Sequence, residues 1–283
     1  MRLRSLLFVP GDRPERFAKA EASGADALIL DLEDAVATAA KATARAAVAS
    51  RLAEVRGRAR LLVRVNPLGT QLFDADLEAL RGLSPDAIMQ PKAEGSASVL
   101  ACAERLEAAG IAAPILPIAT ETPAAIFRLG TYADVKDRLA GLTWGAEDLP
   151  AAIGAATSRE ADGRFTAPYE IARSLTLFAA HAAGVAAIET VYPAFRDEAG
   201  LRAFAARAAR DGFTGMMAIH PSQVAIINAA FTPDAEAIAI ARRIVAAFAA
   251  APDAGALQVD GRMMDAPHLV QARKLLARAG ESE

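Results

Sequence analysis

The chain has 283 residues and a formal charge of −3 at pH 7, and 53% of its residues are hydrophobic. A chain of this length suits one large α/β domain, and barrels of this size are commonly undivided. Acidic and basic side chains are nearly balanced, without a basic run or an arginine cluster interleaved with aromatic residues. This charge pattern argues against nucleic acid as a partner.

The cysteine content and the N-terminal sequence indicate the cellular compartment of the protein. The single cysteine, Cys102, rules out an internal disulfide, and its apolar neighbours indicate a core position rather than a nucleophile. The first residues lack the apolar stretch and the small-residue cleavage site of a signal peptide. No stretch approaches the roughly 20 uncharged apolar residues of a membrane span. We therefore expect a reduced, soluble, cytoplasmic protein.

Eight short apolar runs, each followed by polar or charged residues, organise most of the chain. Continuous apolar runs are typical of buried parallel strands, and the segments between them have helical patterns. Eight βα units predict an α/β fold, a closed TIM (β/α)8 barrel over residues 1–231, and no GxGxxG follows the first run to suggest a dinucleotide-binding fold. The runs are 5–9, 27–30, 61–65, 87–89, 114–118, 142–145, 185–189 and 216–219.

The last part of the chain, residues 232–283, is surplus to a barrel. Asp234 is a candidate cap for a periodic helix that ends near Ala250, and residues 251–255 break that helix. Residues 258–279 are predicted to form a short turn and a last helix. The stretch 260–267 contains several polar and charged residues, which packing against the flank of the barrel would not require. We therefore predict that residues 232–283 form a separate C-terminal helical extension.

Two acids follow neighbouring predicted strands. Glu121 comes shortly after the run 114–118, and Asp148 comes shortly after the run 142–145. Strand ends of a barrel meet on the face where chemistry is done, and Mg²⁺ is held in proteins by one or two carboxylates with water and substrate. The pair therefore predicts a metal site. The alternative is that each acid only caps the helix that follows it.

Arg64 lies near the end of the third run, on the same predicted face as Leu62. An arginine inside a barrel mouth needs a carboxylate or an anionic ligand as a partner. We therefore interpret Arg64 as a catalytic or substrate-binding residue. A purely structural pair with Glu33 or Asp34 is the open alternative.

Three acids, Asp31, Glu33 and Asp34, crowd the end of the second run. Such acids repel one another unless cations are near, so we expect Arg64, Lys92 or a metal-bound water beside them. Glu33 and Asp34 are candidates to support the metal site through hydrogen bonds. Basic residues at other strand ends could meet the phosphates of a large ligand, although surface solvation is the favoured interpretation for any single one of them. These residues are Arg13, Arg16, Lys19 and Lys92.

With these residues in place, the chain resembles the citrate lyase β-subunit-like (CitE-like) branch of the HpcH/HpaI aldolase family. The matching motifs occur in order along nearly the whole sequence. They specify the family far better than they specify the substrate. They are residues 7–17, 29–36, 64–66, 91–94, 121–122, 144–149 and 219–223.

The resemblance implies a TIM barrel that binds Mg²⁺, or Mn²⁺, through Glu121 and Asp148. It also implies reversible Claisen-type cleavage of a 3-hydroxyacyl-CoA thioester to an acyl-CoA and a 2-oxo acid, with Arg64 supplying positive charge where negative charge accumulates. The remaining implied contacts form two groups. The substrate carboxylate would meet Gly145, Ala146, Glu147 and Asp148, and CoA would pass residues 10–19, including Arg16 and Lys19, and then Pro91 and Lys92.

The resemblance also gives the C-terminal extension a role. Residues 263–267 look like the lid motif of stand-alone malyl-CoA and citramalyl-CoA lyases, in which an aspartate from a neighbouring subunit acts as general acid/base. Asp265 matches that position. A closed, water-poor interface would raise its pKa toward a useful range. The resemblance therefore implies a homotrimer or hexamer whose partners are small molecules and copies of itself.

Three alternatives remain open from the sequence. The chain could be the β subunit of a citrate lyase complex, which acts on a citryl thioester. It could be a class II aldolase acting on free 2-oxo acids, without need of a lid or a CoA channel. It could also be a non-catalytic regulator that binds a 2-oxo acid, although such a protein has no chemical need for a lid acid.

Overall fold

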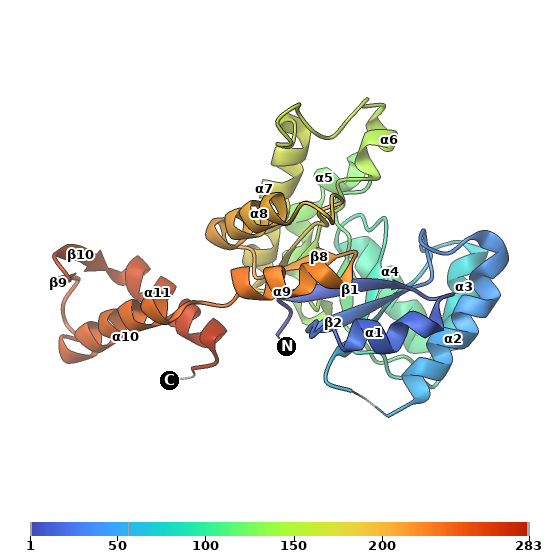
Figure 1. Cartoon of the computed structure of the whole chain (residues 1–283), viewed down its shortest axis with the longest axis horizontal. Coiled ribbons are helices and arrows are strands. Elements are labelled where there is room, and N and C mark those ends of the chain that lie inside the picture. The colour runs from blue at the N-terminus through green and yellow to red at the C-terminus, as the bar shows by residue number, and fades with distance from the viewer. Residues whose placement is uncertain (1, 56, 282–283) are drawn as a thin grey trace. The chain divides into compact units, whose positions relative to one another are not determined.

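The computed structural model describes residues 2–55 and 57–281. By its internal contacts the chain separates into two compact units, Met1–Asn228 and Ala229–Glu283 (Figure 1). The predicted boundary lies after residue 231. Each unit is described by itself below.

The first unit is a barrel of eight parallel strands, as predicted, and each predicted apolar run overlaps one of them. The strands are β1 (Ser5–Pro10), β2 (Ala27–Asp31), β3 (Arg60–Arg64), β4 (Ala87–Gln90), β5 (Ile115–Pro117), β6 (Leu142–Thr143), β7 (Ala187–Glu189) and β8 (Gly215–Ala218). Their order is β5-β4-β3-β2-β1-β8-β7-β6. A parallel bridge between Ile118 and Thr143 brings the two edges together.

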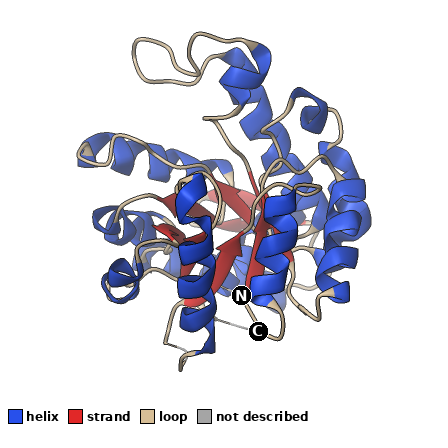
Figure 2. Ribbon diagram, turned by 90° about the vertical axis from the view of Figure 1, so that its right-hand side faces the viewer, coloured by secondary structure: helices blue, strands red, loops and turns tan. Residues whose placement is uncertain are grey.

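Helices surround the strands, which form the centre of the unit in Figure 2. The N-terminal half contains η1 (Pro14–Arg16), α1 (Phe17–Glu21), η2 (Thr38–Ala40), α2 (Lys41–Ala53), α3 (Gln71–Leu80) and α4 (Ser96–Ala108). The second half contains α5 (Pro123–Ile126), η3 (Leu129–Arg138), α6 (Leu149–Ile153), α7 (Ala167–Ala183), α8 (Glu198–Asp211) and α9 (Pro221–Ala230). Strand–helix alternation of this kind is the TIM barrel architecture.

The barrel interior is an apolar cluster built from alternate strand residues. Ile29, Leu62 and Met89 are fully buried members of it, and Phe8 packs against it. Successive side chains of a strand point to opposite faces, so residues two positions farther on continue the same inward face. That rule carries Asp31 and Arg64 to the mouth of the barrel, above the apolar layer.

The second unit contains α10 (Ala235–Ala250), β9 (Ala256–Val259), β10 (Arg262–Asp265) and α11 (Ala266–Ala279). Asp234 caps α10, as predicted, by accepting a hydrogen bond from Ala237 N at 2.7 Å. A small apolar cluster that includes Ile244, Val259 and Leu276 joins these elements. The antiparallel β9–β10 hairpin was not predicted, since the sequence there was expected to form only a turn.

The segment Pro221–Ala250 is long and apolar enough to cross a membrane by length and composition, which the sequence analysis did not anticipate. Its backbone, however, forms two helices, α9 and α10, rather than one. Residues 231–234 interrupt them, and the Asp234 carboxylate is used as a helix cap at this break. The interruption argues against one continuous span.

Candidate active site

Arg64 and Asp31 are direct register partners on the neighbouring strands β3 and β2. Arg64 Nε donates to Asp31 Oδ1 at 2.7 Å, and Arg64 Nη2 donates to Asp31 Oδ2 at 2.5 Å. The third guanidinium nitrogen, Nη1, lies 3.0 Å from Glu33 Oε2. Arg64 therefore has carboxylate partners, as expected, but its bidentate partner is Asp31 and not Glu33 or Asp34. Asp34 is exposed.

The Arg64 guanidinium remains charged in this setting. Burial disfavours the charge, but the hydrogen bonds and the charges of Asp31 and Glu33 outweigh that effect and raise the pKa of Arg64. Its guanidinium carbon also lies 4.8 Å from the centre of the Phe8 ring. The result is a fixed cation at the barrel mouth, held by contacts on several sides.

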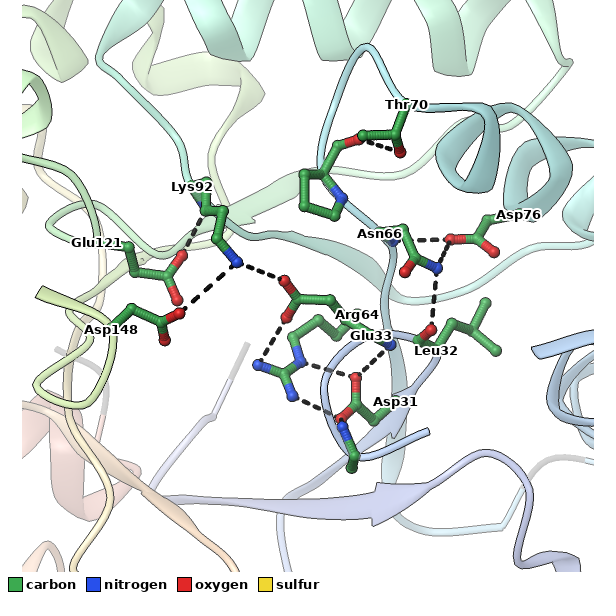
Figure 3. Close-up of polar contacts among 12 residues, drawn as sticks. Asp31, Leu32, Glu33, Arg64, Asn66, Thr70, Asp76, Lys92, Glu121 and Asp148 are labelled. Carbon is green, nitrogen blue, oxygen red and sulfur yellow. Dashed lines mark hydrogen bonds and ion pairs between the residues drawn. The ribbon is translucent and has the colours of Figure 1, made fainter. Parts of the chain in front are cut away.

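Lys92 connects the two groups of acids (Figure 3). Its ammonium donates to Glu33 Oε1 at 3.0 Å and lies 3.6 Å from Asp148 Oδ1. Its backbone N–H donates to Glu121 Oε2 at 2.5 Å. Lys92 adopts a φ of +52°, a left-handed conformation that is unusual for a residue with a side chain and is found preferentially at functional sites.

Neither Glu121 nor Asp148 caps the helix that follows it, so the capping alternative is wrong for both. Thr122, not Glu121, caps α5, because its hydroxyl accepts a hydrogen bond from Ala125 N at 3.2 Å. Asp148 directly precedes α6, but its side chain makes no capping hydrogen bond. Both carboxylates line a cavity instead.

The carboxylates at this site outnumber the side-chain cations that contact them directly. Asp31, Glu33, Glu121 and Asp148 carry four potential negative charges, against one cation each on Arg64 and Lys92. Glu121 is 4% exposed, and burial, aided by the charges of Asp148 and Glu33, raises its pKa to about 8. A buried carboxylate in this situation holds a proton unless a cation replaces it.

The donor set fits a magnesium-type ion. Two carboxylates with excess negative charge suit a hard divalent cation, which takes its other oxygen ligands from water and substrate. Among residues 2–55 and 57–281, no group of three or more His, Cys, Asp or Glu side chains is arranged to hold a metal.

Gly145 packs directly against Glu121. A Cβ at this position would lie 3.0 Å from Glu121 Cγ and 3.2 Å from Ile118 Cγ2. The backbone N–H of Gly145 donates to Thr120 Oγ1 at 3.2 Å, and the same hydroxyl donates to Gly145 O at 3.3 Å. These contacts join the β5 and β6 loops, which carry the two candidate metal ligands.

Contacts behind the acid cluster fix the loop that carries Glu33. The buried Lys41 ammonium donates to Leu32 O at 2.6 Å, to Glu33 O at 2.7 Å and to Asn66 Oδ1 at 3.0 Å. Asn66 Nδ2 in turn donates to Asp76 Oδ2 at 2.7 Å. Sequence reasoning missed Lys41 and Asp76, because nothing in their local patterns distinguishes them from surface helix residues.

The cavity at the barrel mouth has a volume of about 340 Å³. Ala146 on its wall is buried and Glu147 is exposed. A neighbouring cavity of about 350 Å³ shares Arg16 with it and is also lined by Lys19 and His220. The first cavity is lined by Phe8, Pro10, Arg16, Asp31, Asp34, Ala35, Arg64, Ile118, Glu121, Gly145, Ala146, Glu147, Asp148, Thr190, Val191, Met217 and Ile219.

The predicted CoA residues do not all lie together. Arg16 and Lys19 share the second cavity. Pro91 is buried, and the Lys92 ammonium already contacts Glu33 and Asp148. The structure therefore brings Lys92 to the acid cluster, whereas its predicted contact with CoA stays a prediction.

Asp265 lies in the second unit, at the N-terminus of α11. The ring of His268 lies with Nδ1 2.5 Å from Asp265 Oδ1, and this hydrogen bond lowers the pKa of the carboxyl group. The Asp265 side chain is 41% exposed. The pKa of Asp265 is thus lowered in the single chain, and the raised pKa expected for a lid acid at an interface between subunits stays a prediction.

Residues 4–221 match the HpcH/HpaI aldolase/citrate lyase family. The chain is 41% identical over 276 residues to a citrate lyase subunit beta-like protein of Mycobacterium tuberculosis, covering 98% of this chain and 95% of that protein. It is 38% identical over 281 residues to a (3S)-malyl-CoA thioesterase of Cereibacter sphaeroides, covering 98% and 94%.

A solved structure of CitE from Mycobacterium tuberculosis, in complex with magnesium, acetoacetate and coenzyme A, is also similar. The TM-score is 0.83 at 40% sequence identity, covering 99% of each chain. The family resemblance read from the motifs and the predicted barrel are both confirmed. The chain belongs to the HpcH/HpaI aldolase/citrate lyase family and is an enzyme of the carbon–carbon lyase class.

Proposed function

We propose that this enzyme is a magnesium-dependent lyase that cleaves a 3-hydroxyacyl-CoA thioester to an acyl-CoA and a 2-oxo acid. The observation that carries the proposal is the pair Glu121 and Asp148, whose charges are unbalanced beside the Arg64 and Lys92 cations. Mn²⁺ is an alternative metal, since it accepts the same oxygen ligands.

In the proposed reaction, the 3-hydroxyl group loses its proton and the bond between the α and β carbons breaks. The electron pair stays on the α carbon of the acyl-CoA, which then takes up a proton. Bound Mg²⁺ would supply Lewis-acid polarisation of the oxygen that becomes the 2-oxo group. Arg64 contributes a fixed positive charge near that oxygen, and backbone N–H groups of residues 146–148 orient the carboxylate, because the Gly145 N–H already donates to Thr120.

The cavity floor is apolar, so we expect the 2-oxo acid to carry a small or apolar substituent. Ile118 and Met217 are each 3% exposed, and Phe8 and Val191 pack against the same cluster. The cations that line the cavity are Arg64, already paired with Asp31 and Glu33, and Arg16. A second carboxylate on the oxo acid would need a further cation near the floor. We therefore favour citramalyl-CoA and malyl-CoA over a citryl thioester.

The second cavity supports the CoA assignment. It adjoins the first through shared residues, and Arg16 and Lys19 are cations available there for phosphate groups. The relative of known structure binds coenzyme A and magnesium. In our proposal the pantetheine arm runs from the acid cluster toward these two residues.

Asp265 is the proposed general acid/base that exchanges a proton with the α carbon. It would act from the lid of a neighbouring subunit in a homotrimer or hexamer. Its closeness to His268 would hold the carboxylate in one orientation before closure. We place the enzyme in the cytoplasm, where its CoA thioester substrates occur.

The test is a cleavage assay of purified protein on malyl-, citramalyl- and citryl-CoA with Mg²⁺, in which acyl-CoA, 2-oxo acid and free CoA are all quantified. We expect equal amounts of acyl-CoA and 2-oxo acid from citramalyl-CoA or malyl-CoA. Free CoA with an intact hydroxy acid would instead indicate hydrolysis, the activity named for the Cereibacter relative.

Three other outcomes would overturn the proposal. Turnover of only the citryl thioester, and only with partner subunits present, would indicate the β subunit of a citrate lyase complex. Binding of a 2-oxo acid with Mg²⁺ but no cleavage of any thioester would indicate a regulator. Cleavage of free hydroxy acids without CoA would indicate a class II aldolase.

A further inference from the structure

Trp144 directly follows the last residue of β6, Thr143, and precedes the loop that carries Asp148. It is the only tryptophan in the chain and is fully buried. Its indole Nε1 donates a 2.5 Å hydrogen bond to Glu189 Oε1. Glu189 ends the neighbouring strand β7, so a buried carboxylate joins the ends of two adjacent strands.

The Glu189 carboxylate accepts two further hydrogen bonds, from Arg173 and from Thr190. Arg173 of α7 donates from Nε to Glu189 Oε2 at 2.6 Å, and the N–H of Thr190 donates to Glu189 Oε1 at 2.9 Å. Arg173 is itself fixed by Asp211, whose Oδ2 lies 2.8 Å from Arg173 Nη1. Its guanidinium carbon lies 4.8 Å from the centre of the Phe213 ring. The carboxylate is thus oriented from outside the barrel.

A continuous set of contacts leads from this carboxylate to both candidate metal ligands. Trp144 is followed by Gly145, whose backbone exchanges hydrogen bonds with the Thr120 hydroxyl. Thr120 directly precedes Glu121, and residues 146–148 follow Gly145. Thr190, next to Glu189, lines the same cavity. Glu189 itself does not line it, so it cannot contact the substrate there.

A buried ion pair is a poor source of stability, because desolvation offsets the attraction and apolar replacements are often neutral or stabilising. The charge therefore calls for a role other than stability. Two of the hydrogen-bond donors to Glu189, Trp144 and Thr190, directly follow β6 and β7. The carboxylate can therefore fix the ends of these two strands relative to each other.

We propose that Glu189 is a positioning residue that, through Trp144, holds the 145–148 loop in the geometry that binds the metal and the oxo acid. This inference rests on the proposed function, because it takes Glu121 and Asp148 as metal ligands. Residues that orient metal ligands from behind typically contribute about 10–100-fold to metal affinity.

The test uses Glu189→Gln, which keeps the size of the side chain and removes its charge. Metal affinity is measured directly, with Mn²⁺ as an electron paramagnetic resonance probe and Mg²⁺ as its competitor. We expect the affinity to fall about 10–100-fold. We also expect the emission of the metal-free protein to change, because Trp144 is its only indole and loses its charged acceptor.

Two further variants separate positioning from general damage. Trp144→Phe removes the indole donor and leaves the Glu189 charge in place. It should weaken the metal affinity by a similar factor, and it keeps the proposal testable if Glu189→Gln folds poorly. Glu198→Gln breaks a separate, exposed pair on α8, with Arg202, and should leave the metal affinity unchanged.

The outcomes distinguish this inference from the proposed function. If the wild-type protein binds neither Mn²⁺ nor Mg²⁺, the proposed function itself fails. If the wild type binds metal, and folded Glu189→Gln and Trp144→Phe bind it equally well with unchanged KM for the thioester, the positioning role of Glu189 is wrong and the lyase proposal stands.

Discussion

Arg64 and Asp31 face each other across β3 and β2, and two hydrogen bonds of 2.7 and 2.5 Å join the guanidinium to the carboxylate. Asp31 is fully buried, and it also accepts from Glu33 N at 2.9 Å. The arginine is therefore oriented before any substrate arrives. Preorganised charge of this kind is what stabilises a developing oxyanion without reorganisation during the reaction.

Arg64→Lys should preserve the charge but lose the paired hydrogen bonds, because an ammonium cannot form the planar two-point contact. We expect turnover to fall by about 100-fold, as when a single oxyanion donor is removed. Steady-state kinetics on the preferred thioester measure this. The matched control is Arg60→Lys at the opposite end of β3, where the side chain is 56% exposed and pairs with Asp86. Equal activity of the two variants would contradict the role of Arg64.

Glu121→Gln should make the metal-free protein more stable at alkaline pH. The pKa of Glu121 is about 8 in the folded protein against an ordinary value of 4.5, so the folded state binds the proton more tightly than the unfolded state. The free energy of unfolding therefore falls as pH rises between these two values. Glutamine removes this effect, and the expected gain at pH 8 is on the order of 1–3 kcal/mol.

Thermal unfolding in EDTA and in Mg²⁺, at pH 6 and pH 8, tests this expectation. Mg²⁺ should stabilise the folded wild type, because a ligand stabilises the state that binds it. It should not stabilise Glu121→Gln, because this variant lacks one of the two proposed metal ligands. The control is Asp148→Asn, whose side chain is 34% exposed and which should gain less in EDTA while also losing the Mg²⁺ effect. A Glu121→Gln protein less stable than wild type in EDTA at pH 8 would refute the argument.

Gly145→Ala should displace the Glu121 side chain. The added Cβ would lie 3.0 Å from Glu121 Cγ, closer than ordinary packing allows. We expect Mg²⁺ affinity to fall about tenfold with little change in the fold. Gly130→Ala is the control, because nothing lies within 4 Å of a Cβ at that position. Unchanged metal affinity in Gly145→Ala would show that the loop adapts.

Asp265→Asn tests the lid acid. Loss of the carboxylate should slow the exchange of the acyl-CoA α-hydrogens with deuterium from solvent by about 100-fold or more. General acid/base catalysis typically contributes about 10²–10⁴-fold to such a rate. Binding of the 2-oxo acid should survive. Asp260→Asn in the same hairpin is the control, since asparagine tolerates the left-handed conformation found there. Undiminished exchange in Asp265→Asn would assign the proton transfer to another residue.

The barrel could be predicted from the sequence because its signal is local. The apolar runs are buried over most of their length, and the turn residues after each run mark the strand end, so eight strands were predicted. The hairpin of the second unit was missed, although its signal was present. Asp260 and Gly261 both have positive φ, the turn conformation that Asp-Gly favours between two strands.

The site was predicted only in part, because its remaining features depend on contacts between distant segments. Glu121 and Asp148 follow strand ends, and Arg64 is the last residue of β3; the sequence marks all three positions. The pairing of Arg64 with Asp31 instead depends on the register of β2 against β3, which an apolar run does not fix. The position of Lys92 among the acids and the Trp144–Glu189 contact likewise depend on how whole elements are placed.

The most direct measurement of the central claim is the Mg²⁺ dependence of citramalyl-CoA and malyl-CoA cleavage by the wild type and by Glu121→Gln. The account predicts that the wild type is inactive in EDTA, regains activity as Mg²⁺ is added, and releases equal amounts of acyl-CoA and 2-oxo acid. It predicts no recovery for Glu121→Gln. Cleavage by the wild type that is equally fast in EDTA, or a Glu121→Gln variant with the wild-type Mg²⁺ dependence, would contradict it.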